Sequence, residues 1–236
     1  HTAPTDLKST PASIDLTTLG AVTPVKDQGQ CGSCWSFSST GAMEGAYFNK
    51  HGSLESMSEQ NFVDCDSLRN GGRDHGCNGG LMDNAFSWAN KNGGLCSEGD
   101  YPYTSGTTKT EGTCSDSACK NSAFAPSSFT DVSANSDDAM MSALAQQTVA
   151  IAIQADDVSF QLYSSGVYTA DCGTNLDHGV LAVGYGSLDG TDYYKVKNSW
   201  ALLGAWTVIS SSRPTFPSAG ASAVSSTVLP LTPTFK

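Results

Sequence analysis

The sequence predicts an α+β protein in which a helical lobe and a β lobe pack against each other. Helix start and stop signals concentrate between residues 33 and 89, whereas short runs of strand-forming residues concentrate between residues 148 and 197. The 236 residues are enough for one or two domains, and the chain contains no internal repeat. We expect a mainly helical lobe over about 12–122, a β lobe over about 123–200 and an aberrant, disordered tail over 201–236.

Serine, aspartate and glycine mark the ends of the expected helices. Ser33 can cap a first helix that stops at Gly52, and Ser58 can cap a second helix. Residues 81–89 form the third expected helix, with aromatic side chains as core candidates. A fourth helix begins at residues 137 and 138, because two aspartates in a first turn face the positive end of the helix dipole.

Three runs in the second half have the composition of β-strands. They read TVAIAIQ over 148–154, VLAVGY over 180–185 and YYKVK over 193–197, and each is bounded by Gly, Asp or Asn. After Trp200 the chain becomes rich in Ser, Thr, Ala and Pro, which by itself is typical of a disordered terminus.

Charge and hydropathy argue against several classes of protein. The net charge of −11 argues against a nucleic-acid partner, which would require a basic stripe. No stretch approaches the ~20 consecutive apolar residues of a membrane-spanning helix, so we expect no membrane partner. The first residues show no signal peptide and are typical of a processed start. The acidity would suit an acidic compartment, although plain solubility explains it equally well.

The strongest candidate for chemistry is Cys34, in the segment QGQCGSCW over residues 28–35. A thiol at a helix start lies near unpaired N–H groups and the positive end of the helix dipole, which favour the thiolate. Gln28 could offer its amide N–H to an oxyanion, together with the backbone N–H of Cys34. Taken alone, the two cysteines of this CxxC segment equally fit half of a zinc site or a redox pair.

Three further segments settle which of these interpretations we prefer. Asp-His-Gly stands at 177–179 before an apolar strand, Lys-Asn-Ser-Trp at 197–200, and Gly-Cys-Asn-Gly-Gly at 76–80. With residues 28–35, they match four signatures of the papain family in the family's order and at roughly its spacing. Over about residues 12–200 the chain therefore resembles a papain-like cysteine protease of the cathepsin L kind.

The resemblance implies a fold and an activity. The fold would be the papain-like one, with a helical N-terminal lobe, an antiparallel β-barrel-like C-terminal lobe and the active-site cleft between them, as one peptidase domain. Cys34 would be the nucleophile, His178 the general base and later the general acid, and Asn198 the residue that orients the His178 ring. Trp200 would shield the hydrogen bond between His178 and Asn198. The implied reaction is peptide-bond hydrolysis by a cysteine endopeptidase, through a thiolate–imidazolium pair and an acyl-enzyme intermediate.

The resemblance also implies a set of substrate-binding residues. The two glycines among them would let backbone groups pair with an extended peptide. Three apolar side chains would line the pocket for the second residue before the scissile bond, so that Leu, Phe or Val should fit there. Core packing alone would explain these three equally well. The implied set is Gly79, Gly80, Met82, Ala152, Leu176, Asp177 and Trp200.

Partners and location follow from the same resemblance. We expect protein or peptide substrates, a propeptide and cystatin-like inhibitors as partners, no cofactor, no metal and a monomeric chain. The segment from Cys65 to Cys77 is too short for the insert that blocks the cleft of cathepsin B-like enzymes, which favours endopeptidase action. The eight cysteines favour an oxidising compartment, and we expect a lysosomal, vacuolar or extracellular location.

Two alternatives come from other functional classes. A catalytically impaired or inactive homologue would bind peptides or inhibitors without cleaving them. A zinc-binding structural module would use the cysteines as metal ligands, and a zinc assay on the purified protein would identify it.

Seven cysteines remain once Cys34 is set aside as a free nucleophile. The resemblance implies disulfides Cys31–Cys77 and Cys65–Cys114. Cys96 and Cys119 would pair with each other, outside the commonest family pattern. In relatives, a cysteine at the position of Cys172 pairs with one in a Cys-Gly motif near the C-terminus. Because no cysteine follows Trp200, we expect Cys172 to be unpaired.

The tail departs from the family pattern at one point. Relatives continue with Gly-x-x-Trp-Gly-x-x-Gly-Tyr, whereas this chain reads ALLGAWTVI over 201–209. Reading the last base of each codon with the first two bases of the next permits the family motif, a Lys-Cys-Gly over 217–220, and a Ser-Tyr-Pro segment followed by a stop codon. We therefore hypothesise a one-base frameshift just after Trp200. Residues from about Ala201 onward are then expected to form no paired strands of the family, apart from 205–209, which can pair beside 193–197.

Overall fold

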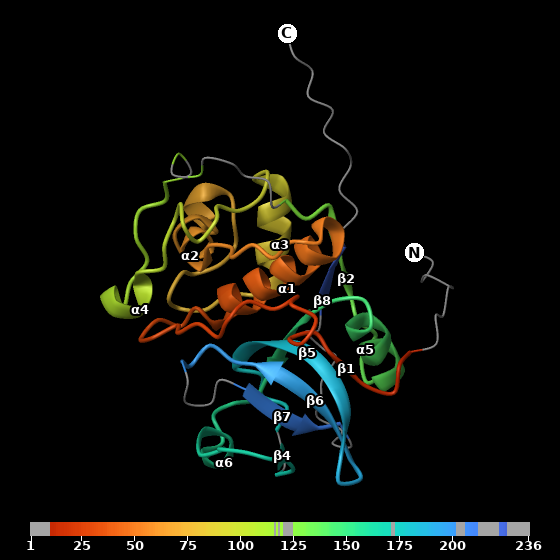
Figure 1. The fold of residues 1–236 in the computed structure, drawn as a ribbon. Coiled ribbons are helices and arrows are strands. Elements are labelled where there is room, and N and C mark those ends of the chain that lie inside the picture. The colour runs from red at the N-terminus through yellow and green to blue at the C-terminus, as the bar shows by residue number, and fades with distance from the viewer. Residues whose placement is uncertain are drawn as a thin grey trace.

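The computed structural model describes residues 10–115, 117, 119, 125–170, 173–201, 206–211 and 222–225. Helices α1 to α4 gather in one half of the molecule, whereas most strands lie in the other half together with α5 and α6 (Figure 1). The helical elements are α1 (Cys34–His51), α2 (Glu59–Cys65), η1 (Leu68–Asn70), α3 (Met82–Lys91), α4 (Ser105–Thr108), α5 (Asp137–Leu144) and α6 (Val158–Gln161). The strands are β1 (Ile14–Asp15), β2 (Ser128–Asp131), β3 (Val149–Ile153), β4 (Val167–Tyr168), β5 (His178–Leu188), β6 (Thr191–Lys197), β7 (Trp206–Ser210) and β8 (Ser222–Ser225).

The expected helices are present, and local capping explains some of their boundaries. Helix α1 ends at Gly52, which adopts the left-handed conformation with φ 71°. Ser58 caps α2 by accepting a hydrogen bond from the N–H of Asn61 at 2.9 Å. The expectation for Ser33 is wrong, because its side chain makes no capping bond. Its hydroxyl lies 2.7 Å from the hydroxyl of Tyr103 instead.

The β half is one sheet whose strands run in the order β2-β8-β3-β5-β6-β7-β4, with β1 paired to β5 off this path. Strands β3, β5, β6 and β7 are antiparallel neighbours, as expected. Strand β4 pairs with β7 in parallel, a local exception in the antiparallel lobe that we expected. Strands β5 and β6 lie between β4 and β7 in the sequence, so this pair joins strands that are not consecutive.

Helix α1 packs directly on the sheet. An apolar cluster joins Trp35, Met57 and Phe86 of the helical half to Ala150 and Leu181 of β3 and β5. A methyl group would not fit at some contacts on this face, since a Cβ on Gly41 of α1 would lie 2.7 Å from a Leu181 methyl carbon. The start of α1 and the start of β5 are thus held together by close packing.

A second apolar cluster lies within the β half, and the N-terminal segment belongs to it. Leu16 and Ala21 pack with Leu144 of α5 and with core residues of the sheet. Ile14 of β1 pairs with Tyr185 of β5. The expected start of the helical lobe at residue 12 is therefore wrong. The segment around Ile14 belongs to the β half, because it pairs with β5, far along the chain.

The tail contains more regular structure than we expected. Residues 206–210 pair with β6 at the position that we predicted for 205–209. The expectation that no other strand follows is wrong, since Ser222 to Ser225 pair with β2 in four register positions. The prolines at 217 and 230 led us to expect breaks, but the residues between them contain no proline and meet an otherwise open edge of β2.

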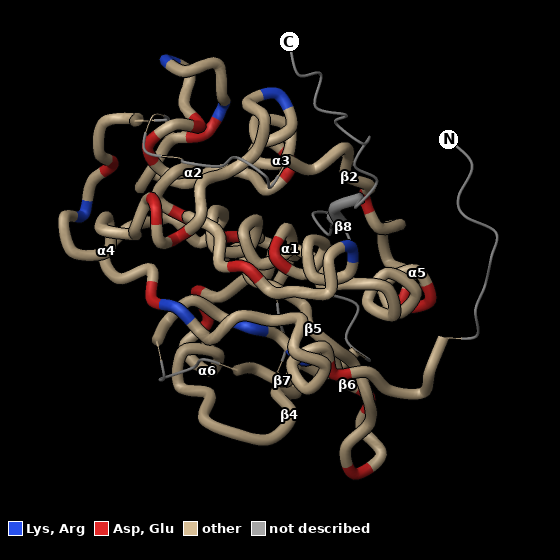
Figure 2. Tube along the Cα trace, turned by 45° about the horizontal axis from the view of Figure 1, so that its top comes forward, with Lys and Arg blue, Asp and Glu red and all other residues tan. Residues whose placement is uncertain are grey.

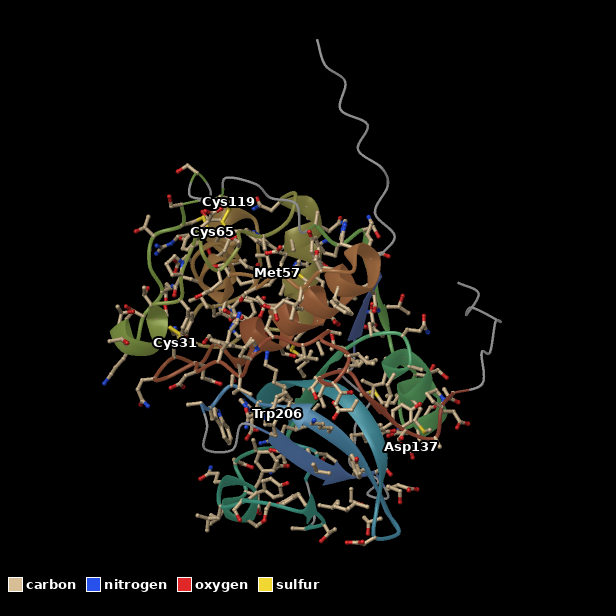
Figure 3. All side chains as sticks on the ribbon, in the orientation of Figure 1. Cys31, Met57, Cys65, Cys119, Asp137 and Trp206 are labelled. Carbon is tan, nitrogen blue, oxygen red and sulfur yellow. A yellow bond between two sulfur atoms is a disulfide. The ribbon has the colours of Figure 1, made fainter. Side chains whose placement is uncertain are left out.

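Among the described residues there are three disulfides, and all lie in the helical half (Figure 3). They are the pairs that we expected, namely Cys31–Cys77, Cys65–Cys114 and Cys96–Cys119. Cys172 lies outside the described residues. No helix in the described part of the chain has the length and apolar character needed to span a membrane.

Candidate active site

Cys34 is the first residue of α1 and, among the described residues, the only cysteine outside a disulfide. A tight turn directly precedes it. Gly32 donates its N–H to the carbonyl oxygen of Cys77 at 2.9 Å, and a Cβ on Gly32 would lie 2.5 Å from that oxygen. Only glycine fits this approach, which the neighbouring Cys31–Cys77 disulfide also fixes.

The sulfur of Cys34 faces the start of β5. The N–H groups of Gly179 and Trp35 are directed at the sulfur, and a Cβ on Gly179 would lie 3.2 Å from the Cys34 carbonyl oxygen. Burial raises the pKa of the Cys34 thiol, these N–H groups lower it, and the carboxylate of Asp177 raises it. The residue before Gly179 is His178, so the fold brings two of the predicted catalytic positions together.

His178 is buried, with 7% of its surface exposed, and its ring is held from two sides. Nε2 lies 2.8 Å from Oδ1 of Asn198, and the Trp200 ring stacks on the imidazole with centroids 4.7 Å apart. The backbone N–H of Ser199 donates to the same Asn198 oxygen at 2.8 Å, which identifies that atom as the acceptor. Nε2 therefore carries a hydrogen, and Nδ1 is the nitrogen free to exchange a proton.

Burial lowers the pKa of His178, while the hydrogen bond to Asn198 and the charge of Asp177 raise it. Within the described part of the chain, the buried amide nitrogen of Asn198 has no hydrogen-bond partner, so this side chain is held through its oxygen, which contacts His178 and the N–H of Ser199.

The side chain and the N–H of Gln28 make three hydrogen bonds. Its Nε2 donates to the carbonyl oxygen of Cys31 at 3.0 Å, and its Oε1 accepts from the hydroxyl of Ser199 at 2.6 Å. The backbone N–H of Gln28 also donates to the carbonyl oxygen of Ser199, at 2.9 Å. One hydrogen of the Gln28 amide remains free, and the backbone N–H of Cys34, at the first helical position, has no partner within its helix.

The predicted substrate-binding residues are only partly gathered. Met82 and Ala152 belong to the same apolar cluster, and Ala152 pairs with Gly179 in the sheet. Leu176 is half-buried just before β5 and is not part of that cluster as far as the structure describes it. Gly79 has φ 103°, a conformation open to glycine.

The other predicted positions lie closer to the catalytic pair. The carboxylate of Asp177 accepts the backbone N–H of Ala155 at 2.7 Å. Trp200 contacts His178, as described above, and also meets Phe160 edge-on, with ring centroids 6.1 Å apart. Gly80 packs so closely that a Cβ would lie 2.6 Å from the Trp35 ring. The two glycine positions thus border the segment that carries Cys34.

A buried charge network behind this site was not predicted. Lys26 Nζ lies 2.6 Å from Glu59 Oε1 and 3.3 Å from Glu44 Oε1. Thr23 donates to Glu44 at 2.6 Å and accepts from Lys197 at 2.8 Å. Burial alone would lower the pKa of Lys26, but the two carboxylates hold it above its ordinary value. The network joins α1, α2 and β6 next to a cavity of about 10 Å³. The one sequence signal was a glutamate within a helix of small and apolar residues.

A pair of buried carboxyls was also not predicted. Asp66 and Asp74 lie in the loop between α2 and α3, where Asp66 Oδ1 accepts from the N–H of Arg73 and Asp74 Oδ1 from that of Leu81, both at 3.0 Å. The second oxygen of each carboxyl is buried without a partner among N–H and O–H donors. Burial and the neighbouring Asp74 raise the pKa of Asp66 to about 7. One proton shared by the pair therefore satisfies both oxygens up to near-neutral pH.

Charge on the molecule and the state of Cys31 bear on the alternatives. In Figure 2 the basic residues are spread along the trace and form no stripe, in keeping with the net charge of −11. The zinc interpretation of the CxxC segment is wrong, because Cys31 is joined to Cys77 and leaves one thiol. No group of three or more His, Cys, Asp or Glu side chains that could hold a metal occurs within the described part of the chain.

Solved structures share this architecture. The chain superposes on the ragweed pollen cysteine protease Amb a 11, in its proform, with a TM-score of 0.85 and 36% identity over 93% of this chain and 67% of that one. It superposes on the cysteine protease CMS1MS2 of Carica candamarcensis, in complex with E-64, with a TM-score of 0.81 and 35% identity over 91% of this chain and 98% of that one.

Curated sequences are more similar still. The senescence-specific cysteine protease SAG39 of Oryza sativa subsp. indica is 48% identical over 196 residues, which are 83% of this chain and 55% of that protein. Vignain of Vigna mungo is 49% identical over 193 residues, which are 81% of this chain and 51% of that protein. The chain thus spans about half the length of these curated relatives.

The fold, with a thiol at a helix start beside a histidine held by an asparagine, defines the class of cysteine proteases. A model described as papain family cysteine protease matches residues 10–206. The chain belongs to the papain family, as a homologue of papain-type cysteine endopeptidases.

Proposed function

We propose that this chain is an endopeptidase in which Cys34 attacks the peptide carbonyl and His178 carries the proton. The observation that supports it best is the bond from Nε2 of His178 to Asn198, 2.8 Å long, which reserves Nδ1 for proton exchange. The N–H of Gly179 is directed at the Cys34 sulfur, which also supports the proposal, because Gly179 directly follows His178 in the chain.

The reactive state is a thiolate–imidazolium pair. Burial opposes each charge taken singly, since it raises the pKa of Cys34 and lowers the pKa of His178. Opposite charges in contact stabilise each other, and the N–H groups at the start of α1 stabilise the thiolate further. The proton of Cys34 therefore resides on Nδ1 of His178 before a substrate binds.

In acylation the sulfur attacks the carbonyl carbon, and the electron pair of the C=O bond moves to the oxygen. The free amide hydrogen of Gln28 and the backbone N–H of Cys34 donate to that oxyanion. His178 gives its Nδ1 proton to the leaving amine as the C–N bond breaks. In deacylation His178 takes a proton from water, the resulting hydroxide attacks the acyl carbon, and the sulfur leaves as thiolate.

Substrate recognition would use backbone pairing and one apolar pocket. Gly79, where a Cβ would meet no atom within 4 Å, leaves room for an extended peptide to pair with the loop before α3, and the neighbouring Gly80 would offer further backbone groups. The shared cluster of Met82 and Ala152 supports an apolar wall for the second residue before the scissile bond, with Leu176 closing it. Leu, Phe or Val is expected there, and Asp177 and Trp200 are proposed as further substrate-binding residues next to His178.

The disulfides and one similar structure support proposals about the location and partners of this protein. The three disulfides are typical of a protein that folds in the secretory pathway. A lysosomal, vacuolar or extracellular site of action is proposed on that basis. The similarity to the ragweed protease in its proform supports a propeptide as an intramolecular partner, and cystatin-like proteins are proposed as inhibitors.

The test compares variants of one histidine and one cysteine with a matched control. Cys34→Ser and His178→Ala should abolish hydrolysis of a peptide amide with Leu or Phe at the second position before the bond. His51→Ala, which removes an exposed histidine at the far end of α1, should retain it. Limiting iodoacetamide followed by mass spectrometry should label Cys34 and should still do so below pH 6. Equal activity in wild type and Cys34→Ser would refute the proposal.

An inactive homologue that binds peptides or inhibitors is the second candidate. It is favoured by one observation, namely that the family match ends at residue 206. In that case Cys34 would react with iodoacetamide and with a peptide aldehyde, but no peptide would be released from a substrate.

A further inference from the structure

Tyr103 occupies an unusual position relative to the proposed active site. Its hydroxyl donates to the backbone carbonyl oxygen of Gln28 at 2.9 Å and lies 2.7 Å from the hydroxyl of Ser33. Gln28 supplies one proposed oxyanion donor, and Ser33 directly precedes Cys34, which supplies the other. One hydroxyl group thus touches both segments that the oxyanion hole requires.

The direction of these hydrogen bonds is fixed. A carbonyl oxygen only accepts, so the single hydrogen of the Tyr103 hydroxyl goes to Gln28. The hydroxyl of Ser33 must then donate to the oxygen of Tyr103. Its other neighbouring acceptor, the carbonyl oxygen of Cys31, is 3.5 Å away. The Ser33 hydroxyl donates to Tyr103 and the Tyr103 hydroxyl donates to Gln28, so each hydroxyl hydrogen has an acceptor.

The segment that carries Tyr103 is itself firmly held. The N–H of Tyr103 donates to Glu98 at 2.9 Å, and the N–H groups of residues 104 and 105 donate to Gln60 of α2 at 2.8 and 2.9 Å. The Tyr103 ring meets Phe37 of α1 edge-on, with centroids 4.9 Å apart. The hydroxyl is therefore a fixed point against which the turn of residues 28–33 is placed.

A close backbone contact supports the same turn. The N–H of Gln30 donates to the carbonyl oxygen of Gly106 at 3.0 Å, and a Cβ on Gly29 would lie 2.6 Å from that oxygen. Without the hydroxyl of Tyr103, residue 28 would be held only by its bonds to Cys31 and Ser199. Displacement of an oxyanion donor by a fraction of an ångström lowers its contribution to the transition state.

We propose that Tyr103 is a positioning residue that sets the distance between the two oxyanion donors, the Gln28 amide and the Cys34 N–H, through its hydroxyl group. The inference rests on the proposed function. It assigns Tyr103 no contact with substrate, so it predicts an effect on charge stabilisation at the carbonyl oxygen and none on the nucleophilicity of the thiol.

The experiment uses Tyr103→Phe, which keeps the ring against Phe37 and removes the hydroxyl. The matched control is Tyr101→Phe, two residues earlier, whose hydroxyl donates to Asp64 at 2.8 Å and not to the turn of residues 28–33. Three quantities are measured on folded protein. They are kcat and KM for a peptide amide, the affinity for a peptide aldehyde, and the rate of Cys34 alkylation by iodoacetamide between pH 4 and 9.

These quantities respond differently because of their chemistry. In aldehyde binding the thiol S–H adds across the C=O bond, and the resulting oxygen lies at the oxyanion position. Alkylation displaces iodide from a saturated carbon and forms no oxyanion. For Tyr103→Phe we expect kcat and aldehyde affinity to fall by about ten-fold, with KM and the alkylation profile unchanged. Tyr101→Phe should change none of these quantities.

Each other outcome overturns the inference. An unchanged kcat and aldehyde affinity in Tyr103→Phe would show that the hydroxyl does not position the donors. A parallel loss in alkylation would show a general disturbance of Cys34, and the same loss in Tyr101→Phe would show a general effect of removing a buried hydroxyl. Failure of the proposed function would be distinguishable, because the wild-type protein would then show no turnover. Comparing the aldehyde affinities of Tyr103→Phe and wild type would still test the role of Tyr103.

Discussion

Among single residues, Asn198 carries the clearest electrostatic role. It accepts a hydrogen bond from Nε2 of His178, and this bond raises the pKa of an imidazole that burial lowers. A hydrogen bond to the charged form of an acid–base group favours that form. Loss of the Asn198 oxygen should therefore make the imidazolium of His178 less stable.

The first prediction is that Asn198→Ala retains measurable activity with a shifted pH profile. The pKa of His178 falls when the bond is lost, so the thiolate–imidazolium pair is deprotonated at lower pH. The upper limb of kcat/KM against pH should move to lower pH, and the maximum should fall by about ten- to hundred-fold through misorientation of the ring. Asn90→Ala, which removes an amide bonded to the backbone near residue 126, should leave the profile in place. An upper limb that moves to higher pH would contradict the argument.

The residues that we propose as catalytic could be selected from sequence, whereas the contacts that support them could not. Cys34, His178 and Asn198 stand in short segments whose residues are contiguous, so the pattern is visible without the fold. The hydroxyl bond from Ser199 to Gln28 joins positions 171 residues apart, and Tyr103 meets Ser33 across 70 residues. Such contacts depend on how segments approach in space, which no local pattern reveals.

Among the elements, the loop between α2 and α3 combines the glycines that we propose to bind substrate with a titrating pair of carboxyls. Burial and the neighbouring carboxyl raise the pKa of Asp66 to about 7, above the ordinary value of 3.8. Asp74 faces His75 and Asn84 as well, and the charge of His75 and the Asn84 bond lower its pKa against the effect of burial. The folded state binds a proton here that the unfolded chain releases at lower pH.

The second prediction concerns stability against pH. Because the folded pKa is raised, the pair contributes its full stability below about pH 4 and loses it as pH rises through about 7. In Asp66→Asn the amide donates to Asp74 at every pH, so the melting temperature should fall less between pH 5 and 8 than in wild type. Asp189→Asn, in an exposed turn where asparagine tolerates the positive φ of 51°, is the control. Equal slopes in Asp66→Asn and wild type would contradict the shared proton.

The elements were predicted to different degrees for physical reasons. The end of α1 at Gly52 and the starts of α2 at Ser58 and of α5 at Ser136 are set by capping residues next to the helix, so local sequence suffices for these boundaries. Strand β8 has no such local signal, because its pairing is decided by the open edges of β2 and β3. The buried network around Lys26 escaped prediction for the same reason, since its members come from four separate segments.

At the scale of the whole molecule, the frameshift hypothesis accounts for the change after Trp200. The family match stops at residue 206, close to the proposed break. Strand β7 is nevertheless formed by TVI at its centre, a run of strand-forming residues that suits the edge of β6. Pairing at an edge requires suitable composition more than a particular sequence, so the fold tolerates the altered segment there.

The third prediction is a count of thiols. Six cysteines are joined in three disulfides, so the folded and denatured chain should each contain two free thiols, Cys34 and Cys172. Restoring the other reading frame after Trp200 should supply a partner for Cys172, lower the count to one and raise the melting temperature. Thiol titration with and without denaturant measures this directly. A count of zero in the unaltered monomer, which would require Cys172 to be disulfide-bonded within the chain, would show that the proposed pairing is wrong.

The place of β8 in the sheet has a consequence for synthesis of the chain. Ser222 pairs with Asp131 of β2 and with Ala150 of β3, so this strand fills a slot between two strands that are made much earlier. Translation proceeds at about 5–20 residues per second, so the slot stays open for an interval on the order of seconds. During that time two unpaired strand edges face neighbouring nascent chains on the same messenger. Slower translation of the last third should therefore lower the yield of soluble protein more than slower translation of the helical half, unless a chaperone covers those edges.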